Sequence, residues 1–233
     1  MLQIKYPGFL ITFEGGEGGG KTTQSIRLRK KLLELDREVI TLREPGGTAI
    51  SEQIRQVALS PDNIGMEFST EVLLFQAARA QLYHEIVIPS LEVGKIVVMD
   101  RSRDSSVVYQ GMVRGFGRKI IESLNNLSTD NIFPDLTYLL DLPVDLGLKR
   151  RVDSGKMDRL DMEAREFHQQ VREAYLQLAK EDAANRWVII NAEQKLEQVE
   201  KDIWTEVENR LFKKNDSQKS DSGKKIPCYL DEK

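Results

Sequence analysis

The segment from Gly15 to Thr22 constrains the fold of this chain more than any other stretch. It reads Gly-Gly-Glu-Gly-Gly-Gly-Lys-Thr, which satisfies the pattern G-x-x-x-x-G-K-[ST]. The apolar run Phe9–Phe13 precedes it, and a segment with helical spacing follows it. In such a loop, glycines let consecutive backbone N–H groups approach a phosphate, and the helix start adds partial positive charge. The sequence therefore predicts a strand, a phosphate-binding loop and a helix in this order.

The residue types within this loop suit ATP. Lys21 is expected to bridge the β- and γ-phosphates, and the Thr22 hydroxyl is expected to bind Mg²⁺. Asp100 ends the apolar run Ile96–Met99, where the carboxylate that accompanies such a loop is expected. We predict that Thr22 and Asp100 form the metal site. ATP is predicted to lie on Gly15, Gly16, Glu17, Gly18, Gly19, Gly20, Lys21, Thr22 and Thr23.

Five short apolar runs predict the strands of a sheet. They are Phe9–Phe13, Val39–Leu42, Ile96–Met99, Leu136–Leu140 and Trp187–Ile190. Segments with helical spacing lie between them, and one further apolar stripe consists of Leu196, Val199, Ile203, Val207 and Leu211. Apolar strands that alternate with amphipathic helices are typical of a parallel sheet with helices on both faces. We predict a P-loop α/β kinase fold with a five-stranded parallel sheet and a mobile lid near residues 150–160.

Composition sets the domain limits and excludes some partners. The chain has 233 residues, of which 40% are apolar, enough for the core of one α/β domain. From residue 213 onward the text is charged and polar, so we predict a domain over 1–212 and a flexible tail over 213–233. The 34 basic and 37 acidic residues argue against nucleic acid as a partner. A single cysteine and the lack of a long apolar run predict a cytoplasmic protein that does not bind membranes.

A phosphate-binding loop does not by itself separate a kinase from a nucleotide-dependent switch. The guanine-reading pattern Asn-Lys-x-Asp is absent from the sequence. The segment Asp62-Asn63-Ile64-Gly65 matches the D-x-x-G pattern of a switch, but it follows Pro61 and not an apolar strand. We interpret it as a turn.

Four further segments bear on this choice. They are REPGGT at 43–48, LLFQAAR at 73–79, DRSRDSS at 100–106 with Tyr109-Gln110-Gly111 after it, and Asp-Arg-Leu at 158–160. With the phosphate-binding loop they resemble bacterial thymidylate kinases over residues 9–211. The resemblance implies phosphoryl transfer from ATP to dTMP with Mg²⁺, and a homodimer. A kinase for another nucleoside monophosphate or a deoxynucleoside stays open, as does, from a different class, a P-loop regulatory switch.

The resemblance implies a dTMP site whose residue types suit that ligand. Arg101 can hold a phosphate through two N–H groups. Phe75 offers a flat face to the pyrimidine, and Arg79, one helical turn later, can donate to a carbonyl oxygen of the base. Glu17 matches the carboxylate that reads the sugar 3′-OH. The remaining residues that match the nucleoside pocket are Glu44, Pro45, Ser106 and Tyr109.

Two departures from the family pattern affect the site. Ser102 follows Asp-Arg, where an aromatic residue or His is common. Gly18 stands where some members have an arginine. Members with glycine there usually supply an arginine from the lid, yet one expected lid position holds Ser154.

The transferred phosphoryl group needs cations and no general base, because a dTMP phosphate oxygen is already ionised near neutral pH. The catalytic residues that we expect are Lys21, Arg101, Arg159 and Arg150. Arg159 is preferred over Arg150 because its Asp-Arg-Leu setting matches the family. If neither acts, the alternatives are Arg151, Lys156 and Arg103.

Overall fold

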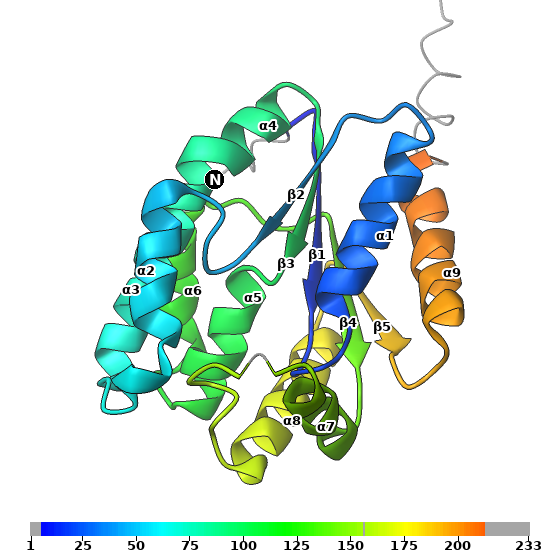
Figure 1. Ribbon diagram of the computed structural model, residues 1–233. Coiled ribbons are helices and arrows are strands. Elements are labelled where there is room, and N and C mark those ends of the chain that lie inside the picture. Colours follow the sequence, from blue (N-terminus) through cyan, green and yellow to red (C-terminus); the bar gives the residue numbers. More distant parts are fainter. Residues whose placement is uncertain (1–5, 156, 213–233) are drawn as a thin grey trace, which may run out of the picture.

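A single parallel sheet forms the centre of the molecule, as predicted. In the computed structural model, residues 6–155 and 157–212 are described; the predicted tail and Lys156 lie outside them. The strand order is β2-β3-β1-β4-β5 (Figure 1). The strands are β1 (Phe9–Glu14), β2 (Val39–Arg43), β3 (Ile96–Asp100), β4 (Leu136–Asp141) and β5 (Trp187–Asn191).

Each strand is one residue longer than the apolar run that predicted it, and the added residue is polar. Backbone pairing continues to the end, since Phe13 and Arg43 both lie opposite Asp100 in the ladders. Ladder hydrogen bonds use only the main chain, so a polar side chain does not stop pairing. Because parallel strands end at the same edge, polar side chains gather there, where α/β proteins bind ligands. They are Glu14, Arg43, Asp100, Asp141 and Asn191.

Two groups of helices cover the two faces of the sheet, as predicted. Helices α1 (Lys21–Leu33) and α9 (Leu196–Val207) pack on the face that buries Ile11 and Phe13. Leu10, the residue before Ile11, faces the opposite side, because side chains alternate across a strand. That side is covered by α3 (Phe68–Leu82), α4 (Ile88–Glu92), α6 (Arg118–Ser128) and α8 (Arg165–Lys180).

The predicted stripe on α9 is buried at Val199, Ile203 and Val207, whereas Leu196, at the helix start, is 37% exposed. Helix α2 (Ala49–Leu59) packs along α3, and a single 3₁₀ turn, Pro61–Asn63, joins them. The switch-like pattern is therefore a turn, as we interpreted it.

The segment predicted as a lid begins in α7 (Val144–Asp153) and continues through turns toward α8. In Figure 1, α7 lies below the carboxyl ends of β1 and β4. Its mobility stays a prediction. Among residues 6–155 and 157–212, every helix is too short or too polar to cross a lipid bilayer.

Candidate active site

The phosphate-binding loop connects the end of β1 to the first turn of α1. Gly20, in a left-handed conformation with φ 88°, caps the helix, and Lys21 is its first residue. The Lys21 ammonium donates to the carbonyl oxygens of Gly16 at 2.7 Å and Gly15 at 3.2 Å. Burial, followed by the nearby Arg101 charge, lowers the pKa of Lys21 to about 8. The loop thus holds a buried cation at the helix N-terminus, where phosphate is favoured.

The two predicted metal ligands are next to each other. Thr22, at the start of α1, donates its hydroxyl hydrogen to the carboxylate of Asp100, at the end of β3. Hydroxyl and carboxylate oxygens are ligands that Mg²⁺ prefers, and Mg²⁺ commonly takes only one or two of them from protein while water and phosphate supply the rest. The pair fits Mg²⁺ bound together with ATP.

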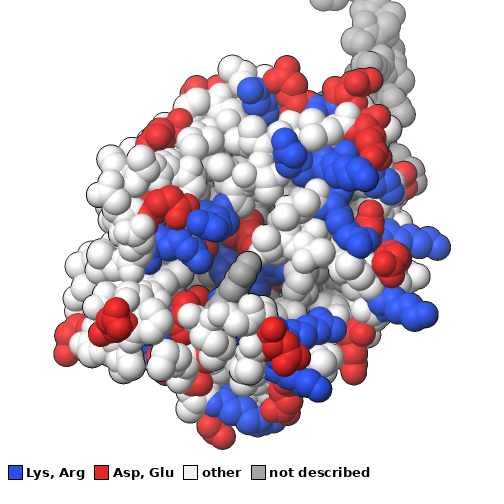
Figure 2. Space-filling view, viewed as in Figure 1, with Lys and Arg blue, Asp and Glu red and all other residues white. Residues whose placement is uncertain are grey.

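A cavity of about 1000 Å³ extends from this loop along the carboxyl ends of the strands to α3. Figure 2 shows the hollow, with Lys and Arg side chains at its floor. Of the predicted site residues, those that line it are Glu17, Gly18, Gly19, Gly20, Lys21, Thr22, Thr23, Glu44, Pro45, Phe75, Asp100, Arg101, Ser106, Tyr109 and Arg150. Gly15, Gly16, Arg79 and Arg159 lie outside the lining.

Arg101 lies in the cavity between the phosphate-binding loop and Tyr109. Its guanidinium donates to the Gly15 carbonyl at 2.9 Å and to the Glu17 carboxylate at 2.6 Å. The Tyr109 hydroxyl donates to the same Glu17 oxygen at 2.9 Å. Burial by itself raises the pKa of Glu17, but Arg101 and Lys21 outweigh this effect and hold the pKa at about 2. The structure therefore brings Glu17, Arg101 and Tyr109 into contact.

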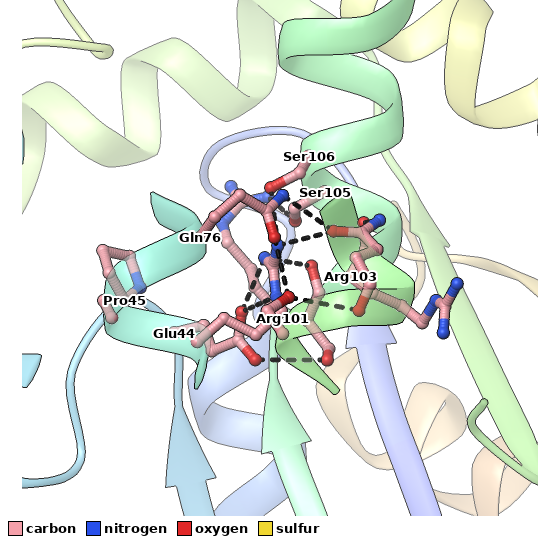
Figure 3. A network of polar contacts seen from close by, with 12 residues as sticks. Glu44, Pro45, Gln76, Arg101, Arg103, Ser105 and Ser106 are labelled. Carbon is pink, nitrogen blue, oxygen red and sulfur yellow. Dashed lines mark hydrogen bonds and ion pairs between the residues drawn. The ribbon is translucent and has the colours of Figure 1, made fainter. Parts of the chain in front are cut away.

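Arg79 lies in the layer behind the cavity wall. It is almost fully buried and donates to Glu44 at 2.7 Å and to Ser106 at 3.0 Å. Further donor contacts go to Asn125 and to the Ser102 carbonyl. A buried guanidinium must have its donors satisfied by protein groups, and these acceptors satisfy them. Arg79 therefore supports Glu44 and Ser106, which are labelled in the polar network of Figure 3 and line the cavity. Its contact with a base stays a prediction.

Phe75 serves both the core and the cavity. It is half-buried and packs against the cluster of α8 and the segment after α5 (Arg103–Ser106), and it also lines the cavity. Gln110 lines the cavity beside it, with its amide donating to the buried Glu71 at 2.7 Å. A flat aromatic face beside a fixed amide is suited to a planar base.

Helix α7 rests directly on the phosphate-binding loop through two glycines. A Cβ atom on Gly18 would lie 2.2 Å from the Gly147 carbonyl oxygen, and one on Gly147 would lie 2.3 Å from the Glu17 carbonyl oxygen. The α7 backbone thus occupies the space that a side chain at position 18 needs. A side chain at position 18 is therefore excluded as the source of a cation over the phosphates.

Two arginines of α7 line the cavity. Arg150 is exposed, and its guanidinium lies 3.4 Å from the Gly18 carbonyl oxygen. Arg151 is held by Asp161, with both carboxylate oxygens at 2.9 Å from Nε, and by Asp158. The structure therefore places Arg150 beside the loop, and ties Arg151 to the turn after α7.

Arg159, our first choice for the lid cation, lies elsewhere. Its guanidinium is buried, pairs with Glu71 of α3 at 2.6 Å and donates to the Ala58 carbonyl at 3.1 Å. Arg159, in the Asp-Arg-Leu segment, therefore forms a buried ion pair with α3 and a hydrogen bond to the end of α2, and both contacts hold the lid segment in place. Asp158 and Leu160, on either side of Arg159, do line the cavity.

Neither Ser102 nor Arg103 reaches the cavity. Ser102 is fully buried, and its hydroxyl lies 2.8 Å from the Tyr83 hydroxyl and 3.3 Å from Glu44. Arg103 donates to Asn126 and to the Ile132 carbonyl, and in Figure 3 it points away from Ser105 and Ser106. Arg103 is therefore excluded as the alternative cation.

Several residues that line the cavity or lie behind its wall went unpredicted, and of these Glu14 and Tyr175 lie behind the wall. Gln110, Arg43 and Ser105 lie within the segments that carried the resemblance, so this signal was available. Glu14, Arg55 and Tyr175 carry no comparable signal. Arg55 donates to the Pro45 carbonyl at 2.7 Å and lines the cavity, and Tyr175 reaches the site only because α8 packs under the end of β1.

A nucleotide phosphate loop, a hydroxyl–carboxylate pair at its helix and a second binding space beside them define a P-loop phosphotransferase. A sequence model described as thymidylate kinase matches residues 13–203. The chain is 43% identical to thymidylate kinase of Pelobacter propionicus over 211 residues, 88% of this chain and 96% of that protein. It is 45% identical to that of Geotalea uraniireducens, over 88% and 98%. The chain belongs to the thymidylate kinase family.

A solved structure supports the assignment of the fold. The crystal structure of thymidylate kinase from Ehrlichia chaffeensis matches with a TM-score of 0.71 at 30% sequence identity. The match covers 86% of this chain and 98% of that one. The predicted α/β P-loop fold and the predicted family are confirmed.

Proposed function

We propose that this chain transfers the γ-phosphoryl group of ATP to dTMP, giving dTDP and ADP. The observation that carries the proposal is the position of Arg101. Its guanidinium lies between the phosphate-binding loop, at Gly15, and the nucleoside side of the cavity, at Glu17. An arginine at this junction can hold the acceptor's phosphate in line with the phosphoryl group that Lys21 binds.

The acceptor nucleoside is proposed to lie between Phe75, which stacks on the base, and Glu17, which accepts a hydrogen bond from the 3′-hydroxyl. The low pKa of Glu17 keeps it ionised, and an ionised carboxylate accepts stronger hydrogen bonds. Tyr109 fixes this carboxylate from the other side. Glu44 and Ser106, supported by Arg79, complete the wall.

Catalysis in this site is proposed to consist of positioning and neutralisation of charge. The attacking dTMP oxygen is ionised near neutral pH, so no residue has to remove a proton. Lys21 and Arg101 hold the donor and acceptor phosphates, and Arg150 neutralises charge from the α7 side. Thr22 and Asp100 would hold Mg²⁺, which neutralises charge on the ATP phosphates when bound.

A coupled assay for ADP release tests the proposal with a panel of acceptors. We expect dTMP to give the highest kcat/KM, with dUMP, which lacks the methyl group, lower by roughly 10–200-fold. Lys21→Ala is the control that should abolish turnover with every acceptor. Higher activity with UMP or with thymidine would assign a different acceptor. Nucleotide binding without turnover on any acceptor would favour a regulatory switch.

We propose that the chain acts as a homodimer in the cytoplasm. Apolar side chains are exposed on three neighbouring helices, α2, α3 and α6, which lie side by side in Figure 1. Leu127 is 78% exposed and Leu73 is 62% exposed, and Ile50, Val57 and Ile120 are about half exposed. Apolar residues gathered in this way are typical of an interface between subunits.

Light scattering on the purified protein tests the homodimer. We expect twice the chain mass for the wild type and a single chain mass for Leu127→Arg, because an unpaired charge at an apolar interface is costly. Val93→Arg is the matched control, since Val93 is 69% exposed and lies outside these three helices. A wild-type protein of single chain mass would contradict the homodimer and leave the proposed activity untouched.

A further inference from the structure

Glu14, the last residue of β1, is a buried carboxylate that the proposed reaction does not use. It is fully buried and accepts three hydrogen bonds. The Ser102 amide donates to Oε1 at 2.8 Å, and the hydroxyls of Ser105 and Tyr175 reach Oε2 at 2.6 and 2.8 Å. Burial, followed by the nearby Asp104 charge, raises the pKa of Glu14 to about 7, and the hydroxyl donors and Arg101 oppose the rise. These hydrogen bonds and the Arg101 charge therefore offset only part of the cost of burying this carboxylate.

The two hydroxyl groups connect Glu14 to Arg101. Arg101 Nη1 lies 3.4 Å from Ser105 Oγ and 3.3 Å from the Tyr175 hydroxyl, and the two oxygens lie 2.8 Å apart. A hydroxyl has one hydrogen and two lone pairs. When Glu14 is ionised, both hydroxyls can donate to its carboxylate, which leaves their lone pairs for the guanidinium. Glu14 therefore sets the direction of the acceptors that surround Arg101.

Glu14 also holds the backbone on which Arg101 stands. Arg101 has φ 67°, a left-handed conformation that is strained for a residue with a side chain. The amide on one side, Arg101 N, donates to the Phe13 carbonyl at 2.9 Å, and the next amide, Ser102 N, donates to Glu14. Two consecutive residues of β1 thus fix both peptide groups that flank Arg101.

We propose that Glu14 is a positioning residue that directs Arg101 at the phosphate of the acceptor. The proposal rests on the proposed function, in which Arg101 holds that phosphate. Glu14 does not line the cavity, whereas Arg101 and Ser105 do. Its effect therefore reaches the acceptor through Arg101, and is limited to acceptors that carry a phosphate.

Titration calorimetry with dTMP and with thymidine isolates this effect, because thymidine has no phosphate. Glu14→Gln presents an amide N–H₂ to the two hydroxyls and reverses their direction. We expect dTMP affinity to fall at least about tenfold and thymidine affinity to stay within about twofold. In an Arg101→Ala background, Glu14→Gln should lower dTMP affinity by less than about twofold, because both changes act through one group.

Thr12→Val is the matched control. Thr12 is fully buried in the same strand and bonds to Thr137 at 3.0 Å, away from the cavity, so dTMP affinity should stay unchanged. If Glu14→Gln does not fold, Ser105→Ala and Tyr175→Phe each remove one hydroxyl and should give a smaller selective loss of dTMP. Equal losses for dTMP and thymidine, or additive losses with Arg101→Ala, would overturn the positioning role. A wild type that binds thymidine as tightly as dTMP would instead contradict the proposed function.

Discussion

The acceptor side and the lid side of the cavity both present arginines, but the protein holds them in different ways. Arg101, on the acceptor side, is part-buried and has carbonyl, carboxylate and hydroxyl acceptors within reach. Arg150, on the lid side, is exposed, and among the described residues its guanidinium contacts the Gly18 carbonyl at 3.4 Å, longer than a strong hydrogen bond. Arg101 is therefore preorganised, whereas the guanidinium N–H groups of Arg150 can still turn toward a ligand.

This difference follows from the elements that carry the two residues. Arg101 follows β3, an inner strand of the sheet, and the phosphate-binding loop, α5 and α8 supply its acceptors. Arg150 stands near the end of α7, which meets the loop closely at Gly18 and Gly147. A fixed arginine selects the acceptor phosphate in the ground state, whereas a less fixed one can respond to charge that develops in the transition state.

The largest expected effect is that of Lys21→Ala, which removes the cation shared by both sides. We expect kcat to fall by more than about 10³-fold with the fold intact, because a charge on the transferred group is lost. Turnover is measured by ADP release. Lys149→Ala, an exposed lysine on α7, is the control that should retain activity. Near-normal turnover of Lys21→Ala would show that the loop does not hold ATP as proposed.

Arg150→Ala tests the lid side. We expect kcat to fall by about 10²–10³-fold while both KM values change little, the signature of an interaction made mainly in the transition state. Steady-state kinetics with dTMP and ATP varied separately measure this. Arg101→Ala is the counterpart and should raise KM for dTMP. If Arg150→Ala keeps kcat within about tenfold, Arg151 is the remaining cavity-lining arginine of α7.

Arg159→Ala separates a lid anchor from a catalytic cation. Removing one partner of a buried ion pair costs about 3–5 kcal/mol, so the free energy of unfolding should fall by that amount. Denaturant unfolding measures it. Arg165→Ala removes an exposed pair with Asp145 and should leave stability nearly unchanged. A stable Arg159→Ala variant with kcat reduced more than about tenfold would restore the catalytic role first expected for this residue.

Phe75→Ala tests whether Phe75 stacks on the base of the acceptor. Loss of stacking should weaken dTMP binding by about 1–3 kcal/mol and leave ATP affinity nearly unchanged. Affinities come from calorimetry, and thermal unfolding is recorded alongside because Phe75 also packs against the core. Lower stability with unchanged dTMP affinity would assign Phe75 to the core alone.

The smallest effect is the pH dependence of ATP use. The pKa of Lys21 is about 8 in the folded protein, below its usual range, so its charge is lost from the free enzyme above about pH 8. We expect kcat/KM for ATP to fall above that pH by up to about tenfold per pH unit. Lys21→Arg should remove this inflection. A wild-type profile that is flat to about pH 10 would contradict the low pKa.

Stability is expected to change with pH in the opposite direction from activity. Between about pH 8 and the usual lysine pKa of about 10.4, the unfolded chain binds the Lys21 proton more than the folded chain does. The contribution of Lys21 to stability therefore rises with pH in this window. Thermal unfolding of wild type against Lys21→Met across the window measures it, and a contribution that falls with pH would contradict the sign.

The acceptor side was the more predictable of the two regions. Glu17, Arg101 and Tyr109 were expected together and lie in contact. Their motifs are short and local, and the ends of parallel strands necessarily meet. The lid was less predictable, because the sequence offers several cations within residues 149–159 and does not show which of them are neutralised. Glu71, which neutralises Arg159, lies 88 residues away along the chain.

The sequence by itself determined the phosphate-binding loop, the five strands and the family, since each depends on local spacing and residue type. Tertiary structure alone decided which arginines remain available to a ligand. Arg79 and Arg159 meet buried acceptors from distant segments, because burying a guanidinium requires partners for its donors. Arg150 lies beside the loop because two glycines let two backbones approach, a condition that only packing reveals.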